Sequence, residues 1–350
     1  MVEDLCFEII QKCPNECMFC SSNATYQKEL MVDLDTFKQV IDRFMELGGI
    51  KEISLSGGEP FLHPNLYDMI LYCKTLGIRT VLFTSGVRIN IRLNEFEMSM
   101  LNKKVEDLYY GRGWPEEECQ KAIRWEQGIY RRANSKEFNS IYRAEMEYLK
   151  WAGLDKIVFD LQGGNTDTYR CLMGRDHFDL VMTSIIRAHV VGLETDVHFV
   201  PMKSNYREFP DLLEMLNIAH ADNLSILNFV PQGRGEIHAK ELMLNDEEVK
   251  EFRKIYLKSK ELFKGNIRVG IPLSGEDSHK CTAGLGKLVI RYDGTVLPCP
   301  AFKEFDLERL KNLGIPVWNI YQDLDKIKIS NGTRCKPLCK RLYKMNRNID

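Results

Sequence analysis

The stretch Cys13-Pro14-Asn15-Glu16-Cys17-Met18-Phe19-Cys20 places three thiols within eight residues. It follows the apolar run Leu5–Ile10, which predicts a strand, so we expect the thiols on the loop that leaves this strand. Spacings of three and two residues suit a chain that curls around an iron–sulfur cube. Three local cysteines leave one of the four irons open to a substrate or cofactor. A zinc knuckle with a fourth ligand from elsewhere is the structural alternative.

The rest of the chain alternates short β-rich runs with amphipathic helical segments. We therefore expect an α/β protein with a partial (β/α)6 TIM-like barrel, whose functional loops leave the carboxyl ends of the strands. The predicted strands are Leu5–Ile10, Glu52–Leu55, Thr80–Thr84, Lys156–Leu161, Thr195–Val200 and Leu224–Val230. The predicted helices are Leu34–Leu47, Asn65–Leu76, Phe178–Val191, Tyr206–Leu216 and Asp246–Phe263.

Two regions depart from this alternation. Between Gly86 and Lys156 the chain is longer than one crossover needs, which predicts a helical insertion at about 88–150. This insertion fits a lid, a docking surface or a solvated elaboration, and its predicted helices are Asn94–Tyr109, Pro115–Arg131 and Phe138–Trp151. After Lys264, the runs Lys287–Ile290 and Val296–Leu297 flank the turn pair Asp293-Gly294 and predict a β-hairpin. We expect residues 1–240 to form the barrel and residues 241–350 to form a linker helix and a small hairpin module.

Composition excludes several classes of protein. The 350 residues contain 48 Lys and Arg against 50 Asp and Glu, a formal net charge of -2, which gives no bias toward nucleic acid or anionic membranes. No run of about 18 apolar residues and no signal peptide is present, so a cytoplasmic location is expected. The 11 cysteines are odd in number and mostly clustered, which favours metal binding over disulfides.

The cysteine loop resembles the signature of the radical S-adenosylmethionine superfamily, a CxxxCxxC loop after the first strand with an aromatic residue before the last cysteine, here Phe19. The resemblance implies that Cys13, Cys17 and Cys20 hold a [4Fe-4S] cluster. Its open iron would bind the amino and carboxylate groups of S-adenosylmethionine, with Phe19 near the adenine. An electron from the cluster would release a 5′-deoxyadenosyl radical that removes a hydrogen atom from the substrate. An electron donor such as flavodoxin or ferredoxin is also implied.

Loops after the later strands extend the resemblance. Ser56-Gly57-Gly58-Glu59-Pro60 resembles the superfamily's GGEP motif, whose backbone and acid hold the methionine amino group. Glycines let a backbone approach a ligand closely, and a carboxylate beside an ammonium makes a strong hydrogen bond. Each loop taken singly also fits ordinary turn chemistry. The other implied cofactor contacts are Ser85 after the third strand, Asp160 and Gln162 after the fourth, Asn205 after the fifth, and Gln232 and Arg234 after the sixth.

A second set of cysteines lies toward the end of the sequence. The pattern C-x12-G-x4-C resembles the opening of the SPASM and Twitch auxiliary-cluster modules, and four cysteines fit the shorter Twitch type with one auxiliary [4Fe-4S] cluster. Four thiols also fit a structural zinc site. Among the remaining cysteines, Cys171 is a catalytic candidate, whereas Cys6 and Cys73 are expected to be buried. The second set consists of Cys281, Cys299, Cys335 and Cys339.

The resemblance implies an oxidoreductase-type enzyme, and proteins with Twitch modules act on peptides or on small molecules. We expect modification of a peptide or protein, as in the maturation of ribosomally made peptides. The chain starts twelve residues before Cys13, which predicts no N-terminal peptide-recognition domain and counts against this choice. The alternatives are a small-molecule dehydrogenase or cyclase of the same superfamily and a non-catalytic iron–sulfur carrier or sensor.

Overall fold

The computed structural model describes residues 1–90, 93–111, 113–134, 137–270, 283–284, 286–312 and 314–327. It divides into two compact units, Met1–Val87 with Ile141–Asp350 and Arg88–Ser140. The larger unit carries the main sheet, and the smaller unit is built on two helices.

A ten-stranded sheet forms the larger unit, in the order β12-β11-β10-β1-β2-β3-β6-β7-β8-β9. The neighbours from β10 to β9 run parallel, while β11 and β12 pair antiparallel. The six predicted strands are confirmed, and β9 extends them at one edge. The bounds are β1 Val2–Ile10, β2 Ile50–Gly57, β3 Arg79–Thr84, β6 Lys156–Asp160, β7 Glu194–Phe199, β8 Asn223–Ile226, β9 Asn266–Val269, β10 Lys287–Ile290, β11 Thr295–Leu297 and β12 Trp318–Asn319.

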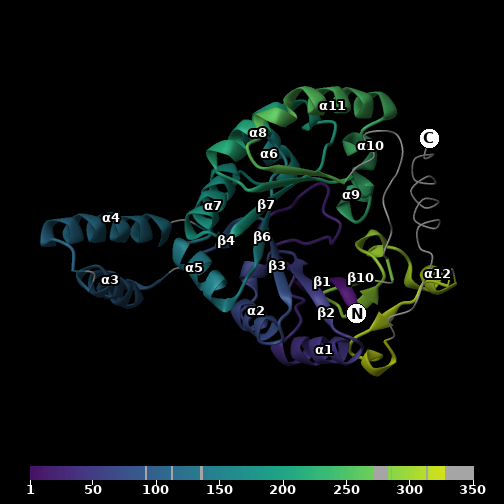
Figure 1. Cartoon of the computed structure of the whole chain (residues 1–350), viewed down its shortest axis with the longest axis horizontal. Helices are drawn as coiled ribbons and strands as arrows, with labels where there is room; N and C mark the ends of the chain where they lie inside the picture. Colours follow the sequence, from purple (N-terminus) through teal and green to yellow (C-terminus); the bar gives the residue numbers. More distant parts are fainter. Residues whose placement is uncertain are drawn as a thin grey trace. The chain divides into compact units, whose positions relative to one another are not determined.

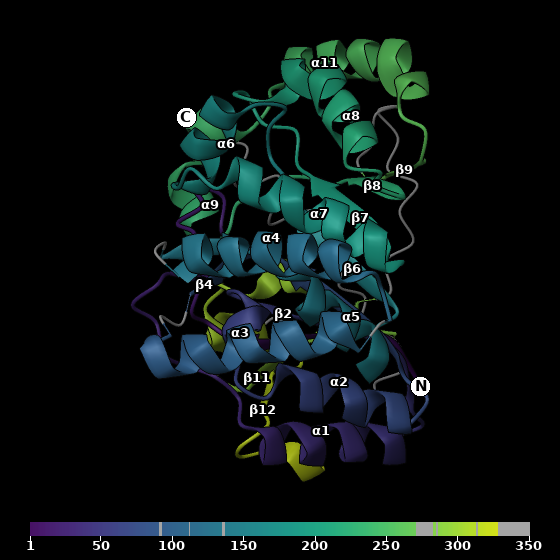
Figure 2. The ribbon, with the colours of Figure 1, turned by 90° about the vertical axis from the view of Figure 1, so that its left-hand side faces the viewer.

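Amphipathic helices cover one face of this sheet, as Figures 1 and 2 show. The rings of Phe7 on β1 and Phe37 on α1 lie 5.2 Å apart, and those of Phe199 on β7 and Phe209 on α8 lie 5.7 Å apart. The covering helices are α1 (Leu34–Glu46), α2 (Leu66–Thr75), α5 (Arg143–Ala152), α7 (Phe178–Val191) and α8 (Phe209–Ile218). The unit also contains α6 (Thr166–Met173), α9 (Arg234–Ile237), α10 (Ala239–Leu242), α11 (Asp246–Ser259) and α12 (Leu307–Asn312).

The opposite face of the sheet, which we call the inner face, carries many polar side chains among apolar ones such as Phe83 and Val158. Successive side chains of a strand point to opposite faces, so Asp4, Cys6 and Glu8 lie on the inner face while Leu5 and Phe7 are buried under the helices. The interior of a filled barrel is instead dominated by branched apolar residues. Polar residues therefore line a face that a filled barrel packs with hydrophobic ones. On neighbouring strands the inner face includes Ser54, Ser56, Lys156, Asp160, Asp196, His198, Ser225 and Arg268.

The predicted C-terminal hairpin is confirmed, and it continues the main sheet. β10 and β11 join at Asp293-Gly294, where Gly294 has a φ of 82°, a left-handed conformation that favours glycine. β10 also pairs parallel with β1, with Asp4 opposite Lys287. A hydrophobic cluster supports this part of the sheet and contains Ala283, Val289, Leu297, Phe302, Leu310 and Ile315.

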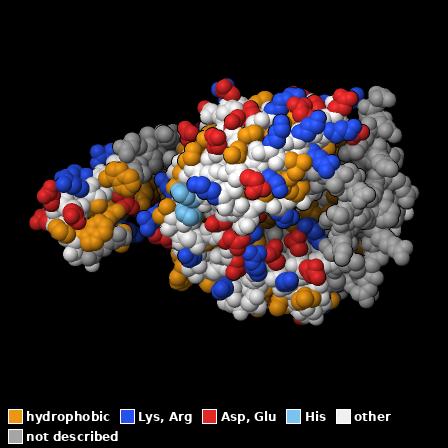
Figure 3. Space-filling model, turned by 45° about the horizontal axis from the view of Figure 1, so that its top comes forward, with side chains coloured by type: hydrophobic (Ala, Val, Ile, Leu, Met, Phe, Trp, Pro, Cys, Tyr) orange, Lys and Arg blue, Asp and Glu red, His pale blue; other side chains and the backbone are white. Residues whose placement is uncertain are grey.

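The smaller unit is a helical hairpin of α3 (Glu95–Tyr110) and α4 (Glu116–Asn134). A capping box of Asn94 and Glu97 starts α3. Val105, Cys119 and Ile123 form the core between the two helices. Large hydrophobic side chains remain exposed on this hairpin, and Figure 3 shows some of them in orange; they are Phe96, Met100, Leu108, Tyr110, Trp114 and Trp125.

The third helix predicted for the insertion, Phe138–Trp151, differs in the structure. Phe138–Ser140 forms β5, which pairs with β4 (Val87–Ile89), and the helix begins only at Arg143. The Glu145 carboxylate accepts a hydrogen bond from the Tyr142 backbone N–H (2.9 Å) and so fixes this start. Because α5 packs against α2 and α7, it is the crossover helix between β3 and β6. The smaller unit accordingly ends at Ser140, earlier than the predicted boundary at about 150.

Candidate active site

The predicted site loops meet at the carboxyl ends of β1, β2 and β3. The Gly58 N–H donates to the Ile10 carbonyl at 2.6 Å, and the Glu59 N–H donates to the Lys12 carbonyl at 2.8 Å. The Glu59 carboxylate in turn accepts a hydrogen bond from the Ser85 N–H at 2.7 Å. The cysteine loop, the Gly57–Pro60 segment and the end of β3 are therefore joined into one structure.

Two glycines make the first of these junctions possible. A Cβ on Gly58 would lie 2.1 Å from the Lys12 carbonyl oxygen, and a Cβ on Gly57 would lie 2.2 Å from the Ile10 carbonyl oxygen. Gly57 also has a φ of 127°. The resemblance to the GGEP motif implies that these glycines let a ligand approach the backbone closely. In the structure the closest approach is to the backbone that leads into the cysteine loop.

Backbone hydrogen bonds hold the cysteine loop from other sides as well. The Cys13 N–H donates to the Thr25 carbonyl at 3.1 Å, and the Met18 N–H donates to the Leu172 carbonyl at 2.9 Å. The second bond ties the loop to α6, which follows β6. Cys171 also lies on α6, but its side chain is exposed.

Arg234, in the segment after β8, binds the cysteine loop through hydrogen bonds. Its Nε donates to the Cys17 carbonyl and its Nη2 to the Ala24 carbonyl, both at 2.8 Å. Its backbone N–H donates to the Cys20 carbonyl at 3.0 Å. The resemblance implies that Arg234 contacts the cofactor; in the structure its hydrogen bonds position the cysteine loop.

The thiols of this loop lie in a setting that suits a bound cation. Cys13 and Cys17 are 8% and 9% exposed. Burial raises the pKa of Cys13, and Glu59 adds to the effect; burial and the other two cysteines raise the pKa of Cys17. Coordination to a metal reverses this preference, because it deprotonates a thiol. No three His, Cys, Asp or Glu side chains of the described ranges converge on a single-ion position, and in a cube each cysteine binds its own iron.

Glu59 is fully buried and connects the loops after β2 and β3. Its Oε1 accepts hydrogen bonds from the Thr84 hydroxyl (2.8 Å) and the Phe61 N–H (3.1 Å), and its Oε2 accepts from the N–H and the hydroxyl of Ser85. Burial raises its pKa to about 7 against the lowering effect of these hydrogen bonds. Pro60 begins the short 3-10 turn Pro60–Leu62 and is buried beside it.

Asp160 ends β6 near Cys17. Burial raises its pKa to about 6, and the Gln162 side chain, which donates to it at 2.6 Å, opposes the shift. Gln162 also accepts a hydrogen bond from the Val200 N–H, and Asn205 donates to the Gln162 carbonyl at 2.9 Å. Gln162 and Asn205 are fully buried and bind protein groups, so in this structure they position Asp160 and the loop after β7.

Phe19 packs against a hydrophobic cluster beside the loop. Met202, which follows β7, belongs to this cluster and is fully buried. The structure therefore brings Phe19, which the resemblance places near the adenine, against the segment that follows β7. The buried members of the cluster are Leu172, Met202, Phe229 and Leu242.

A buried charge network joins β1 to the segment after Cys299, and the sequence analysis missed it. The Lys303 ammonium donates to the Glu8 carboxylate, and the Ser22 hydroxyl donates to the same Glu8 oxygen at 2.5 Å. Glu8 is 1% exposed and Lys303 is 8% exposed. Burial alone lowers the pKa of Lys303, but Glu8 and the nearby cysteines Cys6 and Cys20 raise it overall. A glutamate within the apolar run Leu5–Ile10 is the sequence signal that indicates a buried partner.

Gln232 contacts the segment that carries Lys303, and Cys299 precedes this segment. Gln232 donates a hydrogen bond to the Ala301 carbonyl and accepts one from the Glu304 N–H (3.2 Å), so it links the loop after β8 to the C-terminal segment. Cys299 is half-buried and follows β11 by two residues. The other cysteines of the predicted second cluster, Cys281, Cys335 and Cys339, lie outside the described residues.

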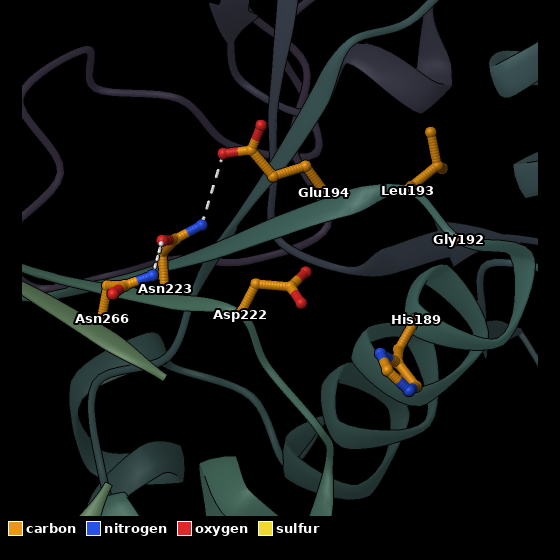
Figure 4. A pocket seen from close by; sticks show the side chains of 7 residues that line it. All are labelled: His189, Gly192, Leu193, Glu194, Asp222, Asn223 and Asn266. Atoms are coloured by element: carbon orange, nitrogen blue, oxygen red, sulfur yellow. Dashed lines mark hydrogen bonds between the residues drawn. The ribbon is translucent and has the colours of Figure 1, made fainter. Parts of the chain in front are cut away.

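A surface hollow of about 520 Å³ lies at the opposite ends of the strands. Figure 4 shows Glu194, Asn223 and Asn266 at the amino ends of β7, β8 and β9, joined by hydrogen bonds. Ligands of parallel α/β proteins bind at the carboxyl ends of strands. The cysteine loop occupies that end, so the hollow is not part of the candidate site.

Residues 7–108, which contain the cysteine loop, the Gly57–Pro60 segment and Ser85, match the sequence model of the Radical SAM superfamily. The chain is an enzyme whose residues 7–108 carry the Radical SAM match. This match implies a [4Fe-4S] cluster and S-adenosylmethionine as cofactors. None of the helices in the described ranges has the length and apolarity that a bilayer crossing requires.

Two curated relatives show what this enzyme is similar to. It is 23% identical over 341 residues to the PqqA peptide cyclase of Bradyrhizobium diazoefficiens, covering 93% of the chain and 74% of that protein. It is 25% identical over 247 residues to a probable GTP 3′,8-cyclase of Saccharolobus solfataricus, covering 69% of the chain and 61% of that protein.

Solved radical SAM structures share the fold and confirm the predicted partial barrel. SuiB of Streptococcus suis bound to the precursor peptide SuiA superimposes with a TM-score of 0.60 at 17% identity, over 93% of this chain and 64% of that chain. Native anSMEcpe with bound AdoMet superimposes with a TM-score of 0.60 at 13% identity, over 92% of this chain and 79% of that chain.

Proposed function

We propose that Cys13, Cys17 and Cys20 hold the [4Fe-4S] cluster at which this enzyme cleaves S-adenosylmethionine, and that the radical modifies a peptide or protein. The observation that carries the first part is the junction of the cysteine loop with Gly57–Pro60 and Ser85. Three thiols on one loop, with Cys13 and Cys17 buried and Cys20 half-buried, fit a cube with one open iron. When bound, the reduced cluster supplies the electron that splits S-adenosylmethionine into methionine and the 5′-deoxyadenosyl radical.

The chain's own residues would bind and orient the cofactor. The protein donors to Glu59 already fill about four acceptor positions, so an ammonium group at this carboxylate takes the place of the Ser85 hydroxyl. Phe19 and the hydrophobic cluster around Met202 offer an apolar surface for the adenine. Asp160, on the inner face near Cys17, is placed to accept hydrogen bonds from a ribose.

Peptide modification is the substrate class that the relatives favour. The PqqA peptide cyclase match covers almost the whole chain, and the SuiB structure that shares the fold holds a precursor peptide. The GTP 3′,8-cyclase match favours a small molecule as the second candidate. A flavodoxin or ferredoxin is the donor class that we propose for the reducing electron.

We also propose that Cys281, Cys299, Cys335 and Cys339 hold an auxiliary [4Fe-4S] cluster. Cys299 follows β11 of the hairpin by two residues, and the positive φ of Gly294 supports the turn that the C-x12-G-x4-C pattern implies. Four thiolates close a site completely. Zinc at the same four thiols is the competing assignment, and metal analysis separates the two.

The first test is metal content and 5′-deoxyadenosine release after anaerobic reconstitution and reduction. We expect about eight irons and cofactor cleavage in the wild type. Cys17→Ala is expected to lose about four irons and all cleavage, and Cys299→Ala to lose about four irons. Cys73→Ala, which truncates a buried cysteine of α2, is the matched control and keeps both properties. Zinc, or iron without cleavage in the wild type, would contradict the proposal.

The raised pKa of Glu59 predicts a pH-dependent stability. Its folded pKa of about 7 lies above the usual 4.5, so the folded state binds the proton more tightly than the unfolded state. Glu59 therefore destabilises the fold increasingly as pH rises from about 4.5 to about 7, by on the order of 3 kcal/mol in total. Denaturant unfolding without S-adenosylmethionine at pH 5 and pH 8 measures this loss. We expect Glu59→Gln to reduce it, and an unchanged pH dependence in the variant would contradict the assignment.

A further inference from the structure

One row of polar side chains crosses the inner face from the candidate site to the edge of the sheet. The parallel register places Asp160 on β6 opposite His198 on β7, His198 opposite Ser225 on β8, and Ser225 opposite Arg268 on β9. Neighbouring strands lie about 4.8 Å apart, so three strand spacings separate the ends of this row by roughly 14 Å. The row begins beside the cysteine loop and ends in a cation.

Arg268 retains most of its hydrogen-bonding capacity. Its Nε donates to the Ser225 hydroxyl at 3.1 Å, and within the described ranges no carboxylate forms an ion pair with its guanidinium. The Ser225 hydroxyl donates its own hydrogen bond to the Asp196 Oδ2 at 3.0 Å. Among the residues that the structure describes, no group accepts from the two Nη groups of Arg268, which form a planar pair of donors on an exposed part of the inner face.

The charged groups around Arg268 balance one another, and Lys156 is the cation among them that forms ion pairs within the described ranges. Lys156 contacts Glu194 at 3.1 Å and Asp196 at 3.7 Å. His198 is neutral at physiological pH, because burial, followed by Arg268 and Lys156, lowers its pKa to about 3. Asp196 is 5% exposed, and its Oδ1 has no hydrogen-bond partner in the structure. A buried acceptor without a partner costs about 1–3 kcal/mol, so a donor that reaches Asp196 Oδ1 would relieve this cost.

We propose that the Arg268 end of this row is a substrate subsite for an anionic oxygen group, a carboxylate or a phosphate, with Asp196 Oδ1 accepting a hydrogen bond from a neighbouring N–H or O–H of the same substrate. A guanidinium fork binds either oxyanion through two parallel hydrogen bonds. The substrate would extend along the row, so that its reacting carbon lies roughly 14 Å from the anchor, near Asp160. This inference rests on the proposed function and names the chemistry of its substrate.

Calorimetric binding to the reconstituted enzyme with S-adenosylmethionine and without reductant tests the subsite. The carboxylate probe is acetyl-Ala-Glu-Ala-amide, compared with its glutamine counterpart, and the phosphate probe is GTP, compared with guanosine. We expect one charged probe to bind at least about tenfold more tightly than its neutral counterpart, and Arg268→Gln to remove that difference. Arg268→Lys should keep part of it. Lys264→Gln, at an exposed lysine two residues before β9, is the matched control and should bind as the wild type does.

The outcomes separate this inference from the proposed function. Preference for the peptide identifies a carboxylate anchor, and preference for GTP identifies a phosphate anchor. The subsite is wrong if neither charged probe exceeds its neutral counterpart, or if Arg268→Gln binds as the wild type does while its unfolding temperature is unchanged. Failure of the wild type to release 5′-deoxyadenosine would overturn the radical assignment and leave an Arg268-dependent binding result standing.

Discussion

Replacement of Gly58 by alanine is expected to abolish cofactor cleavage. The new Cβ would lie 2.1 Å from the Lys12 carbonyl oxygen and 2.5 Å from that of Gln11, and both are backbone atoms that cannot rotate away. The segment that leads into Cys13 must shift, and a displacement of about 1 Å at a reacting site can cost about a hundredfold in rate. Release of 5′-deoxyadenosine by anaerobically reconstituted protein measures the effect, and we expect a loss of at least about a hundredfold.

Gly286→Ala is the matched control for this substitution. Its Cβ would meet only the flexible Glu3 side chain, at 3.2 Å, which can move aside. The control should cleave S-adenosylmethionine at nearly the wild-type rate. Wild-type cleavage by Gly58→Ala would show that the junction between the Gly57–Pro60 segment and the cysteine loop does not position the cluster.

Replacement of Lys303 by methionine is expected to destabilise the fold by about 3–5 kcal/mol. The substitution leaves the Glu8 carboxylate buried and without its cation, while Oε2 of Glu8 already has no hydrogen-bond partner. A buried charge that loses its partner is far more costly than the pair is favourable. Urea unfolding of the reconstituted protein, followed by far-ultraviolet circular dichroism, gives the free energy of unfolding.

The double variant Glu8→Gln/Lys303→Met separates the charge from the loss of packing. Without the buried carboxylate, we expect most of the lost stability to return, because the glutamine still accepts a hydrogen bond from Ser22. A double variant as unstable as Lys303→Met alone would show that the methylene packing of Lys303, and not its charge, holds the segment after Cys299 against β1.

The sequence was sufficient to predict the six central strands and the cysteine loop, because each rests on a local pattern. The apolar run Leu5–Ile10 is enough to predict a strand, and the CxxxCxxC spacing is enough to predict the cluster loop. The pattern also predicted that Gly57, Gly58 and Glu59 belong to the site, and the structure places them against the loop. The physical reason for glycine at positions 57 and 58 is different from the predicted one, since the glycines make room for the backbone of residues 10–12.

The remaining features depend on partners distant in the sequence. Arg234 was expected to contact the cofactor, but its partners are the carbonyls of Cys17 and Ala24, more than 200 residues away. Glu8 and Lys303 are separated by 295 residues, and the sequence around each residue does not predict that the other is its partner. The end of the insertion was misplaced because Phe138–Ser140 has apolar and polar residues that suit a helix or a strand, and only pairing with β4 decides between them.

The parallel pairing of β10 with β1 also determines when the cluster loop can be completed during synthesis. Asp4 and Lys287 are neighbours in the sheet although nearly the whole chain lies between them. During synthesis, the edge of β1 that pairs with β10 therefore stays unpaired until residues beyond Lys303 have left the ribosome. Only then can Glu8 form its ion pair with Lys303. Such a long-range closure is slow and comes late in folding. Iron delivered to the finished chain would meet Cys13, Cys17 and Cys20 on a loop whose supports are already in place.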